Sequence, residues 1–216
     1  MKQKRKRSRV LLFFGTIGLV YWSIDFLNNM IYIHHPTWML TYSSMGFFLT
    51  CIALLIENEV LIFSLFSALF IMEAVLCVDL LYTTILGKSL LGFASYVFAP
   101  DFGKRNLVFT SYHYLIPINL LVGVINSSKA YKKGWLGALG YVFFLLILSF
   151  IFVKPGENIN CIHAVDFCKS KLPIAFVFPE FLRIPIWITL ITVVVYIPSS
   201  YLAVWLNKKG KKQLAS

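Results

Sequence analysis

Residues 60–86 read VLIFSLFSALFIMEAVLCVDLLYTTIL, an apolar run that contains only two charged side chains, Glu73 and Asp79. A helix needs roughly 20 apolar residues to cross a hydrocarbon layer about 30 Å thick, and this run is long enough. Because lipid offers no hydrogen-bond partners to the backbone, the run is predicted to be a transmembrane helix. The whole chain has the same character: 59% of its residues are hydrophobic and 13% are charged, against about 25% charged in soluble domains.

Similar apolar runs lie on both sides of this one. The sequence therefore predicts an all-α polytopic membrane protein, a single integral membrane domain over residues 1–216 with six transmembrane helices. The predicted spans are about 10–33, 39–56, 60–86, 107–127, 135–153 and 184–206. The connectors are short, except for an exterior loop at 154–183.

Positive charge gathers at both ends of the chain. Of the 20 Lys and Arg residues, six lie in a basic tail at 1–9 and four in a second basic tail at 207–216. Basic residues accumulate on the cytoplasmic side of membranes, so both termini are predicted to be cytoplasmic, which an even number of spans allows. Anionic lipid accounts for this basicity, and no nucleic-acid partner is predicted; a protein partner stays unknown.

Polar side chains inside the spans are the informative residues, because ionisable groups at membrane depth cost several kcal/mol. At about 1.5 Å per residue, four predicted helices carry such side chains to the outer third of the membrane. They are Asp25, the pair Thr41 and Ser44, Asp79 and His113. Convergence at one depth indicates a shared cavity.

A hydroxyl, an imidazole and a carboxylate together are the components of an acyl-transfer site. The predicted catalytic residues are His113 as base, Thr41 or Ser44 as nucleophile, and Asp79 as the carboxylate that orients the base. A site about 10 Å below the outer surface meets lipid ester groups, so the predicted substrate is membrane lipid.

Further polar residues are predicted to line this cavity. Tyr112 and Asn119 would donate hydrogen bonds to a developing oxyanion. Asp25 lies at the same depth, and His35 stands in the short exterior turn before span two, where it could shuttle protons.

Two other interpretations of these residues remain open. Ser and Thr in membrane helices commonly bond to a carbonyl one turn back, and Asp79 with His113 would form a neutralised pair that locks two spans. Alternatively, the protein is a non-catalytic membrane component or a small transporter in which Asp25, Glu73 and Asp79 gate a proton or ion.

Cys161 and Cys168 lie in the exterior loop, where an oxidising compartment would allow them to form a disulfide. A zinc site with His163 and Asp166 is the alternative, but the spacing does not match common structural zinc sites. The chain has no glycine-rich phosphate loop and no G-x-S-x-G or H-E-x-x-H motif, so neither a cofactor nor a metal is predicted.

Several short motifs follow one another along nearly the whole chain. They are His35-Pro36-x-Trp38-x-x-Thr41-Tyr42-Ser43-Ser44, then Asp79, Ser111-Tyr112-His113, Asn158-Ile159-Asn160 and Tyr196-x-Pro198. As a set they resemble a family of bacterial six-span membrane proteins of unassigned function. The resemblance implies the same fold and a location in the bacterial inner membrane, and it places Asn158 and Asn160 where they would cap the cavity.

A weaker similarity concerns Trp38-Met39-Leu40-Thr41 and the position of His113 shortly before Ile116-Pro117. These elements are similar to the androgen-induced family of membrane threonine hydrolases, which cleave fatty acid esters of hydroxy fatty acids. The similarity implies a nucleophilic role for Thr41 and a base role for His113. The second element departs from the family's pattern in its spacing and lacks the flanking Asn-His dipeptide.

Overall fold

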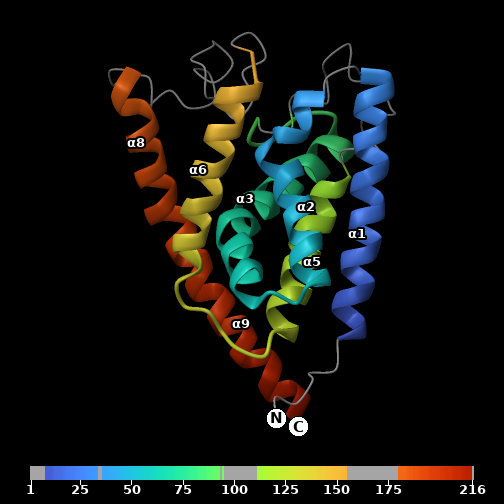
Figure 1. Ribbon diagram of the computed structural model, residues 1–216, viewed down its shortest axis with the longest axis vertical. Coiled ribbons are helices and arrows are strands. Elements are labelled where there is room, and N and C mark those ends of the chain that lie inside the picture. Colours follow the sequence, from blue (N-terminus) through green and yellow to red (C-terminus); the bar gives the residue numbers. More distant parts are fainter. Residues whose placement is uncertain (1–7, 34–35, 93, 95–110, 155–179, 216) are drawn as a thin grey trace.

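The computed structural model describes residues 8–33, 36–92, 94, 111–154 and 180–215, and within these ranges it is all-helical, without strands (Figure 1). The longer elements, in chain order, are α1 (Arg9–Asn28), α2 (Tyr42–Leu55), α3 (Glu59–Leu86), α5 (Tyr112–Asn126), α6 (Gly134–Phe152), α8 (Glu180–Ile191) and α9 (Ile197–Ala215). Shorter turns join or extend them: the π-helix η1 (Asn29–Ile33), the 3-10 helix η2 (Pro36–Leu40) and the π-helix η6 (Thr192–Tyr196), which links α8 to α9.

The described helices run back and forth, so that α1 begins and α9 ends at the same end of the molecule (Figure 1). Four helical stretches are long and apolar enough to cross a membrane: Arg9–Ile31, Glu59–Leu86, Gly134–Phe152 and Ile184–Lys212. The all-helical fold and its membrane-spanning character agree with the sequence prediction.

The other two helices, α2 and α5, have 14 and 15 residues and lie in the interior of the bundle. No residue of α2 is exposed, and Ile118 is the only exposed residue of α5. Their short lengths follow from this position, since backbone at membrane depth can leave the helical form where protein rather than lipid surrounds it.

The boundaries of three predicted spans differ from the structure. Thr41 has extended backbone angles and caps α2, so this helix begins three residues after the predicted start of 39–56. The helix predicted at 107–127 begins at Tyr112, and 107–110 lie outside the described residues. The sixth helical stretch begins at Glu180 instead of 184 and continues to Ala215 instead of ending at 206. Beyond the predicted end, Asn207 donates from its side-chain amide to the carbonyls of Val124 and Ser127 at the end of α5.

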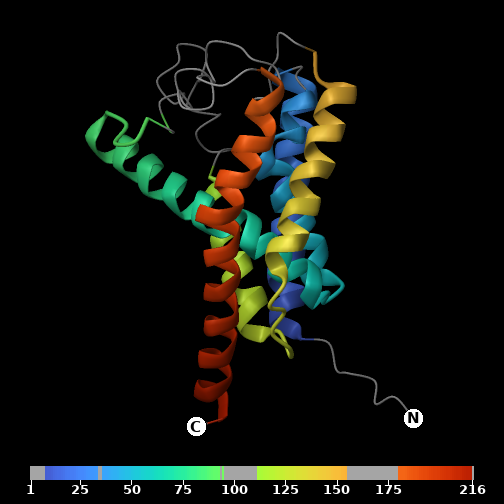
Figure 2. The same cartoon turned by 90° about the vertical axis from the view of Figure 1, so that its left-hand side faces the viewer.

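Helix α3 is the central packing element. All residues from Ile62 to Leu69 are buried. Helix α6 approaches them closely through glycines: a Cβ placed on Gly137 would lie 2.0 Å from the hydroxyl oxygen of Ser64. The second half of α3 slants out of the bundle and exposes apolar side chains, among them Val78, Leu81 and Ile85 (Figure 2).

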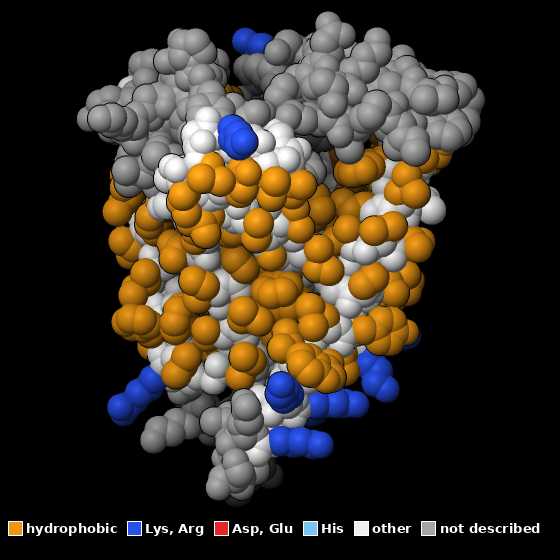
Figure 3. All heavy atoms as spheres, turned by 180° about the vertical axis from the view of Figure 1, so that it is seen from behind, with side chains coloured by type: hydrophobic (Ala, Val, Ile, Leu, Met, Phe, Trp, Pro, Cys, Tyr) orange, Lys and Arg blue, Asp and Glu red, His pale blue; other side chains and the backbone are white. Residues whose placement is uncertain are grey.

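The surface has the pattern of a membrane protein. Figure 3 shows hydrophobic side chains over the middle of one face and Lys and Arg side chains at the end where the chain termini lie. Exposed lysines of the loop before α6 and of the last turns of α9 belong to this end: Lys129, Lys132, Lys133, Lys208, Lys209, Lys211 and Lys212. The described basic residues near the opposite end are Lys88, Lys154 and Arg183 in the first turn of α8.

Candidate functional site

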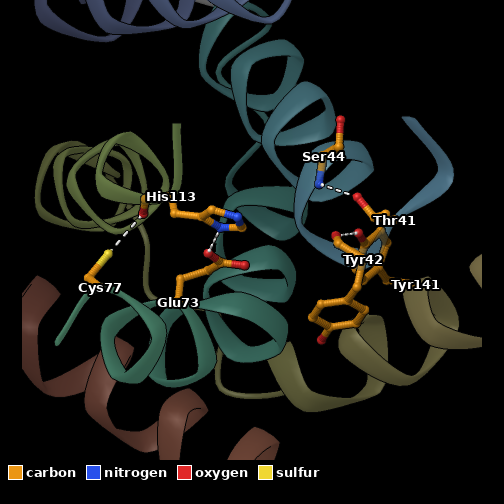
Figure 4. Close-up of polar contacts among 7 residues, drawn as sticks. All are labelled: Thr41, Tyr42, Ser44, Glu73, Cys77, His113 and Tyr141. Carbon is orange, nitrogen blue, oxygen red and sulfur yellow. Dashed lines mark hydrogen bonds and ion pairs between the residues drawn. The ribbon is translucent and has the colours of Figure 1, made fainter. Parts of the chain in front are cut away.

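A hydrogen bond between Glu73 of α3 and His113 of α5 forms the centre of the polar interior (Figure 4). The Nδ1 atom of His113 lies 2.7 Å from Oε2 of Glu73, and the two residues are 6% and 2% exposed. An imidazole and a carboxylate at this distance share a proton, whichever of them holds it.

Pro117 leaves one backbone carbonyl of α5, that of His113, without its helical hydrogen-bond donor. Proline has no backbone N–H, so the carbonyl of His113, four residues earlier, loses its helical partner. The thiol of Cys77 supplies a donor, with Sγ 3.1 Å from that carbonyl oxygen (Figure 4). Since Cys77 lies one turn after Glu73, one face of α3 holds both the ring and the backbone of His113.

A second carboxylate, Asp25, is buried on α1, which packs against α5, and the charge of His113 acts on it. Asp25 is 4% exposed, and the side-chain amide of Asn29 donates to its Oδ1 over 3.1 Å. Two carboxylates and one imidazole therefore share the interior, and when all three are ionised their net charge is −1. Such an excess charge at low dielectric is unfavourable unless a proton or another cation neutralises it.

Tyrosines extend the polar interior from Glu73 toward α2 and α6 (Figure 4). The Tyr42 hydroxyl donates to the carbonyl of Ala68 over 2.8 Å and lies 3.0 Å from the Tyr196 hydroxyl. Tyr141 donates to the carbonyl of Tyr42, and the charge of Glu73 acts on both Tyr42 and Tyr141. Tyr196 ends the π-helix η6, and π-helical turns are frequent at functional sites.

The helices α1, α2, α3, α5 and α6 and the stretch from α8 to α9 thus each contribute a polar group to the interior. The set is Asp25, Tyr42, Glu73, His113, Tyr141 and Tyr196, all buried except the partly buried Tyr42, and we call it the polar core. Asp25 and His113 were predicted to lie in such an interior, whereas Glu73 was predicted only as a candidate for gating. The tyrosines were missed. Tyr42 begins a helix, where aromatic residues are typical of the membrane interface, and Tyr141 and Tyr196 lie inside apolar stretches, where hydropathy does not distinguish them from other hydrophobic residues.

Asp79 does not orient His113, and this prediction was wrong. Its carboxylate accepts hydrogen bonds from the Ser89 hydroxyl and from the backbone N–H groups of Leu90, Leu91 and Ala94, at 2.7–3.0 Å. Asp79 is fully buried and holds the segment after Gly87, the residue whose positive φ of 69° ends α3. Both carboxylate oxygens of Asp79 therefore accept from other donors and are not available to the imidazole of His113.

Thr41 caps α2 and Ser44 lies in its first turn, both away from the imidazole, and both have structural contacts. The Thr41 hydroxyl accepts from the backbone N–H of Ser44 as the helix cap, and the Trp22 indole donates to the carbonyl and hydroxyl of Ser44. Figure 4 shows the Ser44 hydroxyl directed away from His113. Within the described contacts neither hydroxyl bonds to His113, so the predicted nucleophile–base pair is not assembled.

The other predicted lining residues are dispersed. Tyr112 stacks on Phe47 with 5.8 Å between ring centroids, and Asn119 donates to the sulfur of Cys51 over 3.9 Å. His35, Asn158, Asn160, Cys161 and Cys168 lie outside the described residues. In the described part of the chain no three His, Cys, Asp or Glu side chains are grouped closely enough to hold one metal ion.

No protein-family model, curated protein or solved structure matches this chain. The polar core is therefore interpreted from its own chemistry.

Proposed function

We propose that this protein is a small proton-coupled membrane transporter, with Glu73, His113 and Asp25 as its proton-binding group. The observation that carries the proposal is the 2.7 Å hydrogen bond between Glu73 and His113 in a buried interior that also contains Asp25. Ionisable groups are rare within membrane helices because their burial is costly. Those that do occur commonly mark proton or ion pathways.

The proposal includes six membrane crossings with both termini in the cytoplasm and a location in the inner membrane. Four long apolar helices and the two interior helices α2 and α5 support this topology. The lysines at the end where α1 begins and α9 ends support the cytoplasmic side, by the preference of basic residues for it.

Charge balance favours uptake of a proton over a permanent structural pair. A lone Glu73–His113 pair would be neutral overall in either proton arrangement and would need nothing more. Asp25 adds a second buried carboxylate on which the charge of the same imidazole acts, so the group is neutral only with one further proton or cation. Binding and release of that charge is the elementary step of a proton-coupled transporter.

Acyl transfer to a lipid ester receives less support from the same geometry. Glu73 and His113 could act as an orienting carboxylate and base, but the hydroxyls of Thr41 and Ser44 are engaged in α2. Without a nucleophile in reach of the imidazole, the interpretation lacks its central group.

The proposal is tested by proton flux into proteoliposomes that contain a pH-sensitive dye, with NaCl on both sides of the membrane and an imposed pH gradient as the driving force. We expect flux above that of empty liposomes, reduced at least tenfold in Glu73→Gln and in His113→Ala. The matched control is Glu59→Gln, which removes a carboxylate from the first turn of the same helix, where it accepts from Ser128. Equal flux in the Glu73→Gln and Glu59→Gln variants, or no flux above empty liposomes, would reject the proposal.

A further inference from the structure

The side chain of Asn28, at the end of α1, is buried without a hydrogen-bond partner. It is 4% exposed, and neither its Nδ2 nor its Oδ1 has a partner among the described residues. Buried carboxamides are rarely left in this state, and an unpaired one calls for an explanation such as a bound ion or water. Asn28 is therefore a candidate ligand.

Asp25 lies one helical turn before Asn28, so the two side chains share a face of α1. The Oδ1 of Asp25 accepts from Asn29, whereas its Oδ2 has no hydrogen bond within the described chain. A free carboxylate oxygen and a free carboxamide oxygen thus lie on the same buried face. The helix changes from α to π directly after Asn28, and such changes are frequent at functional sites.

The chemistry of this pair fits a hard cation. Carboxylate and carboxamide oxygens are the ligand types that non-transition metal ions prefer, and the pair contributes one negative charge. That single charge matches a monovalent cation better than a divalent one, particularly because the neighbouring His113 can itself become positive.

We propose that Asp25 and Asn28 form a binding site for a monovalent cation, Na⁺, that exchanges with the proton bound by the Glu73–His113–Asp25 group. The inference rests on the proposed function and names its coupling ion. When His113 is protonated, its charge interacts with Asp25 and opposes a cation there. When Na⁺ binds Asp25, a proton leaves the group, so one positive charge enters as another departs and the charge of the interior is unchanged.

Among the described residues, the titratable groups that face this site come from three helices. They are Tyr21 on α1 itself, His113 on α5 and, hydrogen-bonded to His113, Glu73 on α3. Tyr21 is hydrogen-bonded to Ser111 over 2.7 Å. The proton that exchanges with Na⁺ is thus assigned to the imidazole and the two carboxylates.

The experiment measures the thermal unfolding midpoint of the purified full-length protein in NaCl and in N-methyl-D-glucamine chloride at equal ionic strength. A ligand that binds only the folded state raises the midpoint, so Na⁺ should raise it in the wild type. Asn28→Ala and Asp25→Asn should weaken the apparent Na⁺ affinity at least tenfold. Asn28→Asp should strengthen it, because it adds a charged ligand. The matched control Ser23→Ala lies on the exposed face of α1, where Ser23 bonds to the Leu19 carbonyl, and should respond as the wild type does.

A wild type without a Na⁺-dependent shift, or an Asn28→Ala variant with an unchanged one, overturns the inference. Proton release is the second readout: Na⁺ added to weakly buffered protein should lower the pH in the wild type and in Ser23→Ala, and not in Asn28→Ala. Proton flux in liposomes without any Na⁺ response overturns this inference and leaves the proposed function standing. Specific Na⁺ binding without proton flux supports the cation site at Asp25 and Asn28 and rejects proton-coupled transport.

Discussion

The imidazole of His113 and the carboxylate of Glu73 meet 2.7 Å apart at the contact of α5 with α3, and both are almost completely buried. Removal of one partner leaves the other polar group unpaired in the interior. Glu73→Ala is therefore expected to lower the free energy of unfolding by about 3–5 kcal/mol. The double variant Glu73→Leu/His113→Leu should be more stable than Glu73→Ala, which reversible unfolding in detergent would measure. If the destabilisations caused by Glu73→Leu and by His113→Leu alone add up to that of the double variant, the two residues are not coupled.

Cys77 and Pro117 are expected to be coupled through the carbonyl of His113. Cys77→Ala removes the thiol donor and leaves a buried carbonyl unsatisfied, at a cost of about 1–3 kcal/mol. Cys77→Ser keeps a donor and should cost less. In the Cys77→Ala background, Pro117→Ala restores a backbone N–H to the helix and should recover part of the loss. The same loss from Cys77→Ala with and without Pro117 would contradict this account.

Asp79 is expected to act on the segment that follows α3 and not on the proton-binding group. Asp79→Asn replaces the carboxylate that accepts from the N–H groups of Leu90, Leu91 and Ala94 with a weaker, uncharged acceptor. Hydrogen exchange at these amides should become at least tenfold faster, while proton flux in liposomes stays within twofold of the wild type. A flux loss as large as that of Glu73→Gln would place Asp79 in the proton-binding group after all.

Thr41 is expected to matter for stability and not for nucleophilic chemistry. As the cap of α2 it should contribute about 0.5–2 kcal/mol, which Thr41→Ala would lose and Thr41→Ser would largely keep. A fluorophosphonate probe should label neither the wild type nor the variant, because no base is bonded to the hydroxyl. Labelling of the wild type that disappears in Thr41→Ala would restore the lipid-ester interpretation.

The sequence predicted the helical membrane fold well, because long apolar runs such as 60–86 have few alternatives in lipid. It predicted the interior helices less well. Their ends depend on local details, such as the extended backbone of Thr41, that hydropathy does not register.

The candidate site was predicted only in part. Depth along a helix indicated that His113 and Asp25 belong to one level, but depth does not reveal the face of the helix. Glu73 and Asp79 are six residues apart on α3, which is not a whole number of turns, so one reaches His113 and the other faces the segment that contains Ser89. The connection of Cys77 with His113 could have been inferred from Pro117, since the position of the missing N–H identifies the free carbonyl.

Proton exchange on the buried carboxylates is measured most directly by the infrared difference spectrum of the reconstituted protein between acidic and alkaline pH, recorded in the absence of Na⁺. We expect a band from a protonated carboxyl group that takes up and releases its proton reversibly. This band should shift in His113→Ala and disappear when Glu73→Gln and Asp25→Asn are combined. Glu59→Gln should leave the band unchanged. A spectrum without any such band, or a band that persists in the combined variant, would contradict the claim that the buried carboxylates and His113 bind an exchangeable proton.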